Sequence, residues 1–159
     1  MTEDARFEDG RETPLRLKAL DGDDLTVIAA LAQDAVFSVA DLRWDRRTRR
    51  FAVLLNRFRW EDAERATRRG RDFERVQAML VVEDVLGVKS QGVDRNDTEM
   101  VYALLSIAFH PGPDGTGQLE LTLAGDGVIM LQVEALEVIL RDVTRPYAAP
   151  SGKAPNHSD

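Results

Sequence analysis

Residues 118–133 read Gln-Leu-Glu-Leu-Thr-Leu-Ala-Gly-Asp-Gly-Val-Ile-Met-Leu-Gln-Val, and this stretch carries the clearest structural pattern in the chain. Leucines at 119, 121 and 123 alternate with polar residues at 118, 120 and 122, which is typical of a strand with one buried face. The Gly-Asp-Gly sequence at 125–127 allows a tight turn, after which apolar residues return at 129, 131 and 133. The stretch therefore predicts an antiparallel β-hairpin.

The same two-residue period recurs on both sides of this hairpin. Residues 101–109 alternate cleanly, and the glycines and prolines of 111–117 favour a turn after them. Further strands are predicted over 15–19, 35–40, 51–58, 76–82 and 85–89. The polar stretch 41–50 is interpreted as a long turn that joins the strands at 35–40 and 51–58 into a hairpin.

Helical spacing appears in fewer places. Asp21 to Asp24 supply N-cap candidates, and Leu25, Ile28 and Ala32 follow at helical spacing, so a helix is predicted over 23–33. Valines and leucines at 133, 136, 140 and 143 favour a C-terminal amphipathic helix, although a bulged continuation of the preceding strand fits them nearly as well. The charged segment 61–71 forms either a solvated helical turn or a mobile loop.

These elements together predict the fold class. Roughly seven hairpin-linked strands indicate an α+β fold that is mostly antiparallel β, built as two packed small sheets or as a partly open barrel. A C-terminal helix that closes such a barrel would make it pleckstrin-homology-like. This prediction concerns architecture and carries no function with it.

The length and composition bound the domain organisation. A chain of 159 residues suits one globular domain, predicted over 15–147, with disordered ends at 1–14 and 148–159. Cysteine is absent, which excludes disulfides and thiolate chemistry and suits a reducing compartment. The charged amino terminus lacks the apolar core of a secretion signal, and no apolar run reaches membrane-spanning length, so we expect a cytoplasmic protein without membrane insertion.

Several short motifs resemble those of a known family. They are Leu-Lys-Ala-Leu-Asp at 17–21, Asp-Leu at 24–25, Gln-Asp-Ala at 33–35, Arg-Phe-Ala-Val-Leu-Leu-Asn-Arg-Phe at 50–58, Phe-Glu-Arg-Val at 73–76 and Leu-Gln-Val-Glu-Ala-Leu-Glu at 131–137. The set resembles a small family of uncharacterised alphaproteobacterial proteins classed as a domain of unknown function, from about residue 15 to 147. The resemblance implies a bacterial cytoplasmic protein and supplies no site residues.

Charge is unevenly distributed along the chain. The net charge is -7, yet residues 43–75 hold 12 arginines against six acids, a local excess of +6. Guanidinium groups bind phosphates and carboxylates in bidentate fashion and stack on aromatic rings. The residues of a possible anion-binding or partner-binding site are therefore Arg43, Trp44, Arg46, Arg47, Arg49 and Arg50. The alternative is a solvated turn whose arginines pair with acids elsewhere.

Patterns of catalytic chemistry are missing. His110 stands alone before a proline, no serine lies in a nucleophile elbow, and the glycines of 112–117 lack the lysine and helix of a phosphate loop. Asp94 and Asp97 have the composition of a cation-binding or general-base loop, but their spacing favours an Asx-type turn. We accordingly predict no catalytic, cofactor-binding or metal-binding residue.

Three hypotheses about function remain. The first is a non-enzymatic cytoplasmic binding or adaptor module with a protein partner, since charge is segregated and catalytic groups are missing. The second is binding of a phosphate-rich ligand, RNA or another anion through the arginine-rich hairpin 43–50. The third is an enzyme that uses carboxylates in an unfamiliar arrangement.

Overall fold

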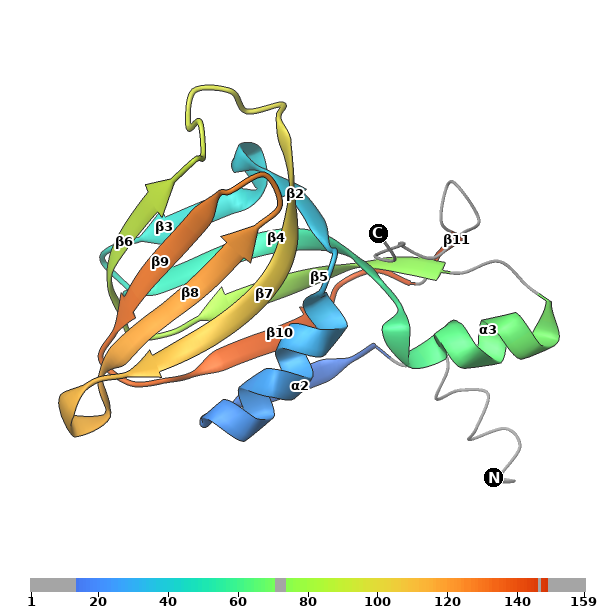
Figure 1. The fold of residues 1–159 in the computed structure, drawn as a ribbon, viewed down its shortest axis with the longest axis horizontal. Helices are drawn as coiled ribbons and strands as arrows, with labels where there is room; N and C mark the ends of the chain where they lie inside the picture. The colour runs from blue at the N-terminus through green and yellow to red at the C-terminus, as the bar shows by residue number, and fades with distance from the viewer. Residues whose placement is uncertain (1–13, 71–73, 146, 149–159) are drawn as a thin grey trace.

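The computed structural model describes residues 14–70, 74–145 and 147–148. Within them the strands form one curved, open antiparallel sheet in the order β1-β10-β5-β4-β2-β7-β8-β9-β6, with β3 paired to β4 and β11 paired to β5 (Figure 1). The strands are β1 (Arg16–Ala19), β2 (Val36–Ser38), β3 (Leu42–Asp45), β4 (Arg50–Phe58), β5 (Glu74–Val82), β6 (Val85–Gln91), β7 (Val101–Pro111), β8 (Gly117–Leu123), β9 (Val128–Val133), β10 (Val138–Asp142) and β11 (Tyr147–Ala148). The mostly antiparallel α+β class is confirmed.

The hairpin at 118–133 is confirmed as β8 and β9. Leu119 pairs with Leu131 and Leu121 pairs with Ile129, so each strand buries the apolar residues that alternate along it. The buried faces meet leucines of β4, β5 and β7 in one core, whose fully buried members include Leu55, Leu80, Leu104, Leu119 and Leu131. The alternation of apolar and polar residues therefore determines which face of the sheet packs into the core.

The N-terminal helix is confirmed as α2 (Gly22–Ala32). The Asp21 side chain accepts a hydrogen bond from the backbone N–H of Asp24 at 2.8 Å, which caps the helix. Leu25, Ile28 and Ala32 form its buried stripe and pack on the sheet, where α2 contacts β7 and β1. The helix thus covers part of the inner face of the curved sheet.

The predicted C-terminal helix is wrong. Residues Val138–Asp142 form the strand β10, which lies between β1 and β5 in the sheet. Val138 and Leu140 are both buried, as a two-residue period requires, whereas Val143 is exposed. Leu136 is buried from the loop between β9 and β10, so its place in the helical spacing is coincidental. The feature that would have made the fold pleckstrin-homology-like is therefore missing.

The long turn predicted over 41–50 is also wrong in its length. A 3₁₀ turn, η1 (Val39–Asp41), and the strand β3 lie between β2 and β4, and only residues 46–49 form the turn. Trp44 pairs with Phe51 and Leu42 pairs with Val53, so the basic stretch contains a strand of its own. This strand matters because one of its faces borders the cavity described below.

The charged segment at 61–71 takes the helical alternative. It forms the 3₁₀ turn η2 (Trp60–Asp62) and the helix α3 (Ala63–Arg69), which projects away from the curved sheet (Figure 1). Within the described part of the chain, none of the helices has both the length and the apolar character needed to cross a bilayer. Apart from Pro14 and Ala148, the segments 1–14 and 148–159, for which disorder is predicted, lie outside the described residues.

Candidate functional site

A cavity of about 590 Å³ lies between β3 and β6, where the curved sheet remains open. Its volume is within the range of about 300–1,000 Å³ that is usual for small-molecule sites. Seven of its ten lining residues are apolar and the other three are Lys89, Ser90 and Arg95. The apolar ones are Val39, Leu42, Trp44, Phe51, Val88, Val93 and Ile129.

The cavity follows from the strand order. β6 ends the sheet and pairs with β9, whereas β3 pairs with β4, and among the described strands β3 and β6 do not pair with each other. At one end the gap is closed, because the Val85 N–H donates to the Arg49 carbonyl at 2.8 Å. Beyond that point two strand edges face the opening without a neighbour. Unpaired edges of this kind are templates for another strand.

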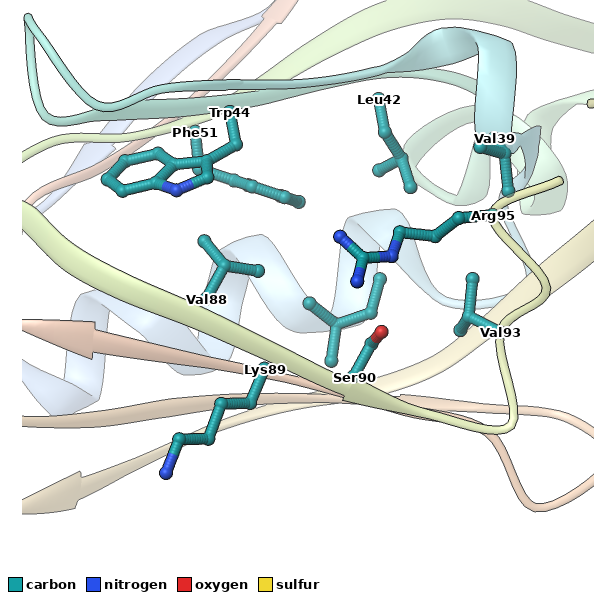
Figure 2. Close-up of a pocket in the computed structure, with 10 residues that line it drawn as sticks. Val39, Leu42, Trp44, Phe51, Val88, Lys89, Ser90, Val93 and Arg95 are labelled. Carbon is teal, nitrogen blue, oxygen red and sulfur yellow. The ribbon is translucent and has the colours of Figure 1, made fainter.

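The β3 side of the cavity is aromatic and aliphatic. Because side chains alternate along a strand, Leu42 and Trp44 face the cavity while Arg43 and Asp45 face solvent. Figure 2 shows the Trp44 indole beside the Phe51 ring, with Leu42 and Val39 further along the same wall. Trp44 is only half-buried and therefore has surface left to cover.

The opposite wall comes from β6 and from the loop that follows it. Val88 pairs with Leu131 and Ser90 pairs with Ile129, so both side chains lie on the core side of the sheet, and Figure 2 shows them pointing into the cavity. The ammonium group of Lys89 points away from the cavity in the same view. β6 thus presents one apolar side chain and one hydroxyl group to the cavity and carries one cation at the outer rim.

Arg95 is an exposed residue that contributes a positive charge to the lining of the cavity. Its guanidinium group extends between Leu42 and Ser90 in Figure 2. The loop that carries Arg95 is held in place, because the Asp94 N–H donates to the Tyr102 hydroxyl at 2.9 Å and the Asn96 N–H donates to Asp94 Oδ1 at 2.9 Å. Within residues 14–70, 74–145 and 147–148, the Arg95 side chain has neither an ion pair nor a hydrogen bond.

The loop of Arg95 is predicted from the sequence as an Asx-type turn, but Arg95 itself is not among the predicted site residues. The Asx turns favoured for it are confirmed, since Asp94 accepts from Asn96, and Asp97 Oδ1 accepts the backbone N–H groups of Glu99 and Met100 at 3.2 Å. Nothing in the local sequence indicates that the arginine between these turns reaches a wall built from residues 39 to 51. Only the approach of the loop to η1 brings them together.

The five arginines predicted around the hairpin separate into two groups. Arg49 Nη1 pairs with Glu134 Oε2 at 2.8 Å, and Arg50 forms two hydrogen bonds with Glu83, which raise the pKa of Arg50. In contrast, Arg43, Arg46 and Arg47 are exposed and form no ion pair within the described part of the chain. Trp44 turns into the cavity and away from this exposed group.

The turn itself is organised by Asp45. Its Oδ1 accepts the backbone N–H of Arg47 at 3.0 Å and that of Thr48 at 3.4 Å. Hydrogen bonds from the Thr48 side chain and backbone hold the pKa of Asp45 below its usual value, so it remains a carboxylate among the arginines. The turn is therefore a defined structure, with Arg49 at a left-handed φ of 57°.

Two further arginines of the basic segment are buried in ion pairs. Arg57 on β4 reaches across β5 to Asp142, with Nε–Oδ1 and Nη2–Oδ2 distances of 3.0 Å, and it also binds Glu61 at 2.8 and 2.9 Å. Burial alone would lower the pKa of Arg57, but its bonds to Glu61 and Asp142 raise it overall. Arg59 lies beside this group and pairs with Glu74 at 2.7 Å. These pairs connect β4, β5 and β10 and leave neither arginine for an external ligand.

Metal-binding geometry is missing from the residues that the structure describes, since no three His, Asp or Glu side chains converge there. His110 is exposed at the end of β7, and its Nε2 lies 2.8 Å from Glu120 Oε1 on the neighbouring strand β8. The glycine-rich stretch after it forms the turn η3 (Pro113–Gly115), as expected. The cavity between β3 and β6 is therefore the candidate site.

Comparison with known proteins agrees with the motif resemblance. A family model described as "Protein of unknown function (DUF2948)" matches residues 15–157. No curated protein and no solved structure matches the chain. The match includes both walls of the cavity and the loop of Arg95. The chain therefore belongs to the DUF2948 family.

Proposed function

We propose that this protein, as a single domain over residues 15–147, is a non-enzymatic cytoplasmic binding module for a protein partner and that the cavity between β3 and β6 is its binding site. The observation that carries the proposal is an apolar cavity of about 590 Å³, bordered by two strand edges that have no pairing partner among the described strands. A pocket lined mainly by apolar side chains with a few polar groups is the usual form of a binding site. The absence of cysteine suits a reducing compartment.

Apolar anchoring supplies the affinity in this proposal. Burying one leucine or phenylalanine side chain contributes roughly 1.5–3 kcal/mol, and the half-buried Trp44 gains contact surface at the same time. Aromatic residues in desolvated pockets are frequent energetic centres of protein interfaces. We expect Trp44 and Phe51 to form such a centre.

The lining residues favour binding over acid–base catalysis. None of the ten residues that line the cavity is an aspartate, glutamate or histidine. Asp142 and Asp62, whose side chains are buried beside Arg57 and Arg59, both lie outside the cavity. The carboxylate-based enzyme considered from the sequence thus gains no support from the cavity.

The proposal is tested by affinity capture with a variant that fills the cavity. Val88→Phe places an aromatic ring in the cavity from a half-buried position, and Arg46→Ala with Arg47→Ala changes the exposed turn instead. We expect a partner recovered by the wild type and by the arginine variant to be lost from Val88→Phe, while all three proteins melt at similar temperatures. Equal recovery by Val88→Phe would contradict the proposal.

A second candidate site is the exposed arginine group of the hairpin 43–50. Arg43, Arg46 and Arg47 form no ion pair within the described residues, which supports binding of a phosphate-rich ligand or RNA there. Thermal melts in sulfate, phosphate, nucleotide or short RNA, each compared with chloride at equal ionic strength, test it. The candidate predicts a higher midpoint that is lost when the three arginines are replaced by alanine, and identical midpoints would remove it.

A further inference from the structure

We infer that the occupant of the cavity is an extended acidic segment of the partner, which adds as a strand to the free edge of β6 and directs a carboxylate to Arg95. This inference rests on the proposed function and specifies the chemistry of the partner. Three features of the described residues support this inference. They are the outer edge of β6, the cavity behind that edge, and the positive charge of Arg95 at the far end of the cavity.

The edge of β6 is suited to strand addition. β6 pairs with β9 on one side, and after the bulge between Val85 and Gly87 its other edge has no neighbour among the described strands. A strand added there completes main-chain hydrogen bonds that are otherwise made with water. Because the sheet is open at this point, the added strand extends an existing antiparallel order.

The cavity behind the edge receives the side chains of such a segment. Successive residues of a strand point to opposite faces, so every second side chain of an added strand faces the core side, as Val88 and Ser90 of β6 do. Two apolar side chains separated by one residue then lie over Trp44, Phe51 and Val88. The remaining side chains face solvent and are free to be polar.

The charge at the cavity selects an acidic segment. Arg95 is an exposed residue that lines the cavity, and its guanidinium has no ion pair in the described part of the chain. Lys89 stands at the rim. A carboxylate is the group that a guanidinium fork binds in bidentate geometry. A second copy of this chain fits less well, because pairing through β6 would bring the Lys89 side chains of both copies to one edge, where like charges repel.

The test uses defined peptides and a single-tryptophan protein. Trp60, whose Nε1 donates to the Gln33 carbonyl at 2.9 Å, is the other of the two tryptophans, so Trp60→Phe leaves Trp44 as the only indole reporter. The probes are hexapeptides with an acetylated amino terminus and an amidated carboxyl terminus. They have apolar residues at alternate positions and a glutamate at the first or the last position. One matched set carries glutamine in place of glutamate. Two further sets carry N-methyl groups on alternate backbone amides, one on the odd-numbered amides and the other on the even-numbered amides.

We expect glutamate peptides to change Trp44 emission and to bind about tenfold more tightly than glutamine peptides, with the difference removed by Arg95→Gln. Methylation of one set of alternate amides should abolish binding, whereas methylation of the other set should have little effect, because only alternate N–H groups face β6. The Val88→Phe variant is the control that binding occurs in the cavity.

Two results would overturn the inference while leaving the proposed function intact. They are equal binding of glutamate and glutamine peptides, and equal binding of both methylated sets. A third result would overturn the inference in favour of a small-molecule ligand: no peptide binds, while the fatty acid dodecanoate changes Trp44 emission in an Arg95-dependent way. The absence of any response to peptides or dodecanoate also overturns the inference. Failure of the proposed function is a separate observation, namely capture of a protein partner that Val88→Phe does not reduce.

Discussion

Arg57 Nε lies 3.0 Å from Asp142 Oδ1, and the Arg57 side chain has 0 % of its surface exposed. The pair joins the end of β4 to the end of β10, with β5 between them. Asp142 Oδ2 also accepts the backbone N–H of Leu15 at 3.0 Å. One buried ion pair therefore links the edge strand region around β1 to the centre of the sheet.

Replacing Arg57 by alanine should lower the free energy of unfolding by about 3–5 kcal/mol, because Asp142 and Glu61 are left as charges without their partner. Urea denaturation measures the loss. Arg43→Ala, which removes an exposed arginine of the same basic segment, should change stability by no more than about 0.5 kcal/mol. Similar effects of the two variants would show that the buried pair is not structural.

Lowering the pH should weaken the ion pairs that Arg57 forms with Glu61 and Asp142. Burial alone would raise the pKa of Glu61, but hydrogen bonding and attraction from Arg57 hold it below the ordinary value of 4.5. As the pH falls, Glu61 therefore takes up a proton in the unfolded state before it does so in the folded state. The contribution of Glu61 to stability is thus present above about pH 4.5 and is lost below it, as the pH approaches the folded-state pKa. Urea midpoints measured from neutral to acid pH should fall less steeply in Glu61→Gln than in the wild type. Parallel curves would contradict the assignment.

Gly117 should tolerate no side chain. A Cβ at this position would lie 2.6 Å from the His110 carbonyl oxygen and 2.6 Å from ring atoms of Phe109, across the β7–β8 pairing. Gly117→Ala should therefore destabilise the protein by roughly 1–3 kcal/mol through overpacking. Gly87→Ala is the matched control, since nothing lies within 4 Å of a Cβ there. If both substitutions leave the thermal midpoint unchanged, then β7 and β8 separate easily at Gly117, which would contradict this prediction.

The ion pair of Arg50 with Glu83 should contribute little. Arg50 is about half exposed in this pair, and solvent and salt screen exposed pairs. Arg50→Ala should accordingly shift the urea midpoint far less than Arg57→Ala does, and the difference from the wild type should shrink in high salt. A shift as large as that of Arg57→Ala, which salt does not reduce, would mean that the turn requires this pair.

Much of the fold could be predicted from the sequence because its strands have one buried face. The alternation at 119–123 and 129–133 fixes both strand type and orientation, and the capping aspartate with Leu25 and Ile28 fixes α2. The prediction was wrong over 133–143, where a loop leucine at 136 completes a helical spacing although Val138 and Leu140 alternate as a strand. Short apolar runs satisfy both periods, and only pairing with β1 and β5 decides between them.

The candidate site could be predicted only in part. Trp44 was selected from its basic neighbours, but the structure places it in a cavity with residues up to 85 positions away, such as Ile129. The charge pattern could not distinguish Arg57, which is buried in ion pairs, from Arg46, which is exposed. Burial and partner choice depend on long-range strand pairing, and Arg95 remained unrecognised for the same reason.

The central claim is that the cavity between β3 and β6 is where this protein binds its partner. Amide chemical shifts of the isotopically labelled protein, recorded while the captured partner is added, test it directly. The account predicts that the largest changes occur at Leu42 and Trp44 on β3, at Val88 and Ser90 on β6 and at Arg95, with little change in the 46–49 turn. Changes centred on the 46–49 turn or on the exposed face of α2, with the cavity residues unaffected, would contradict it.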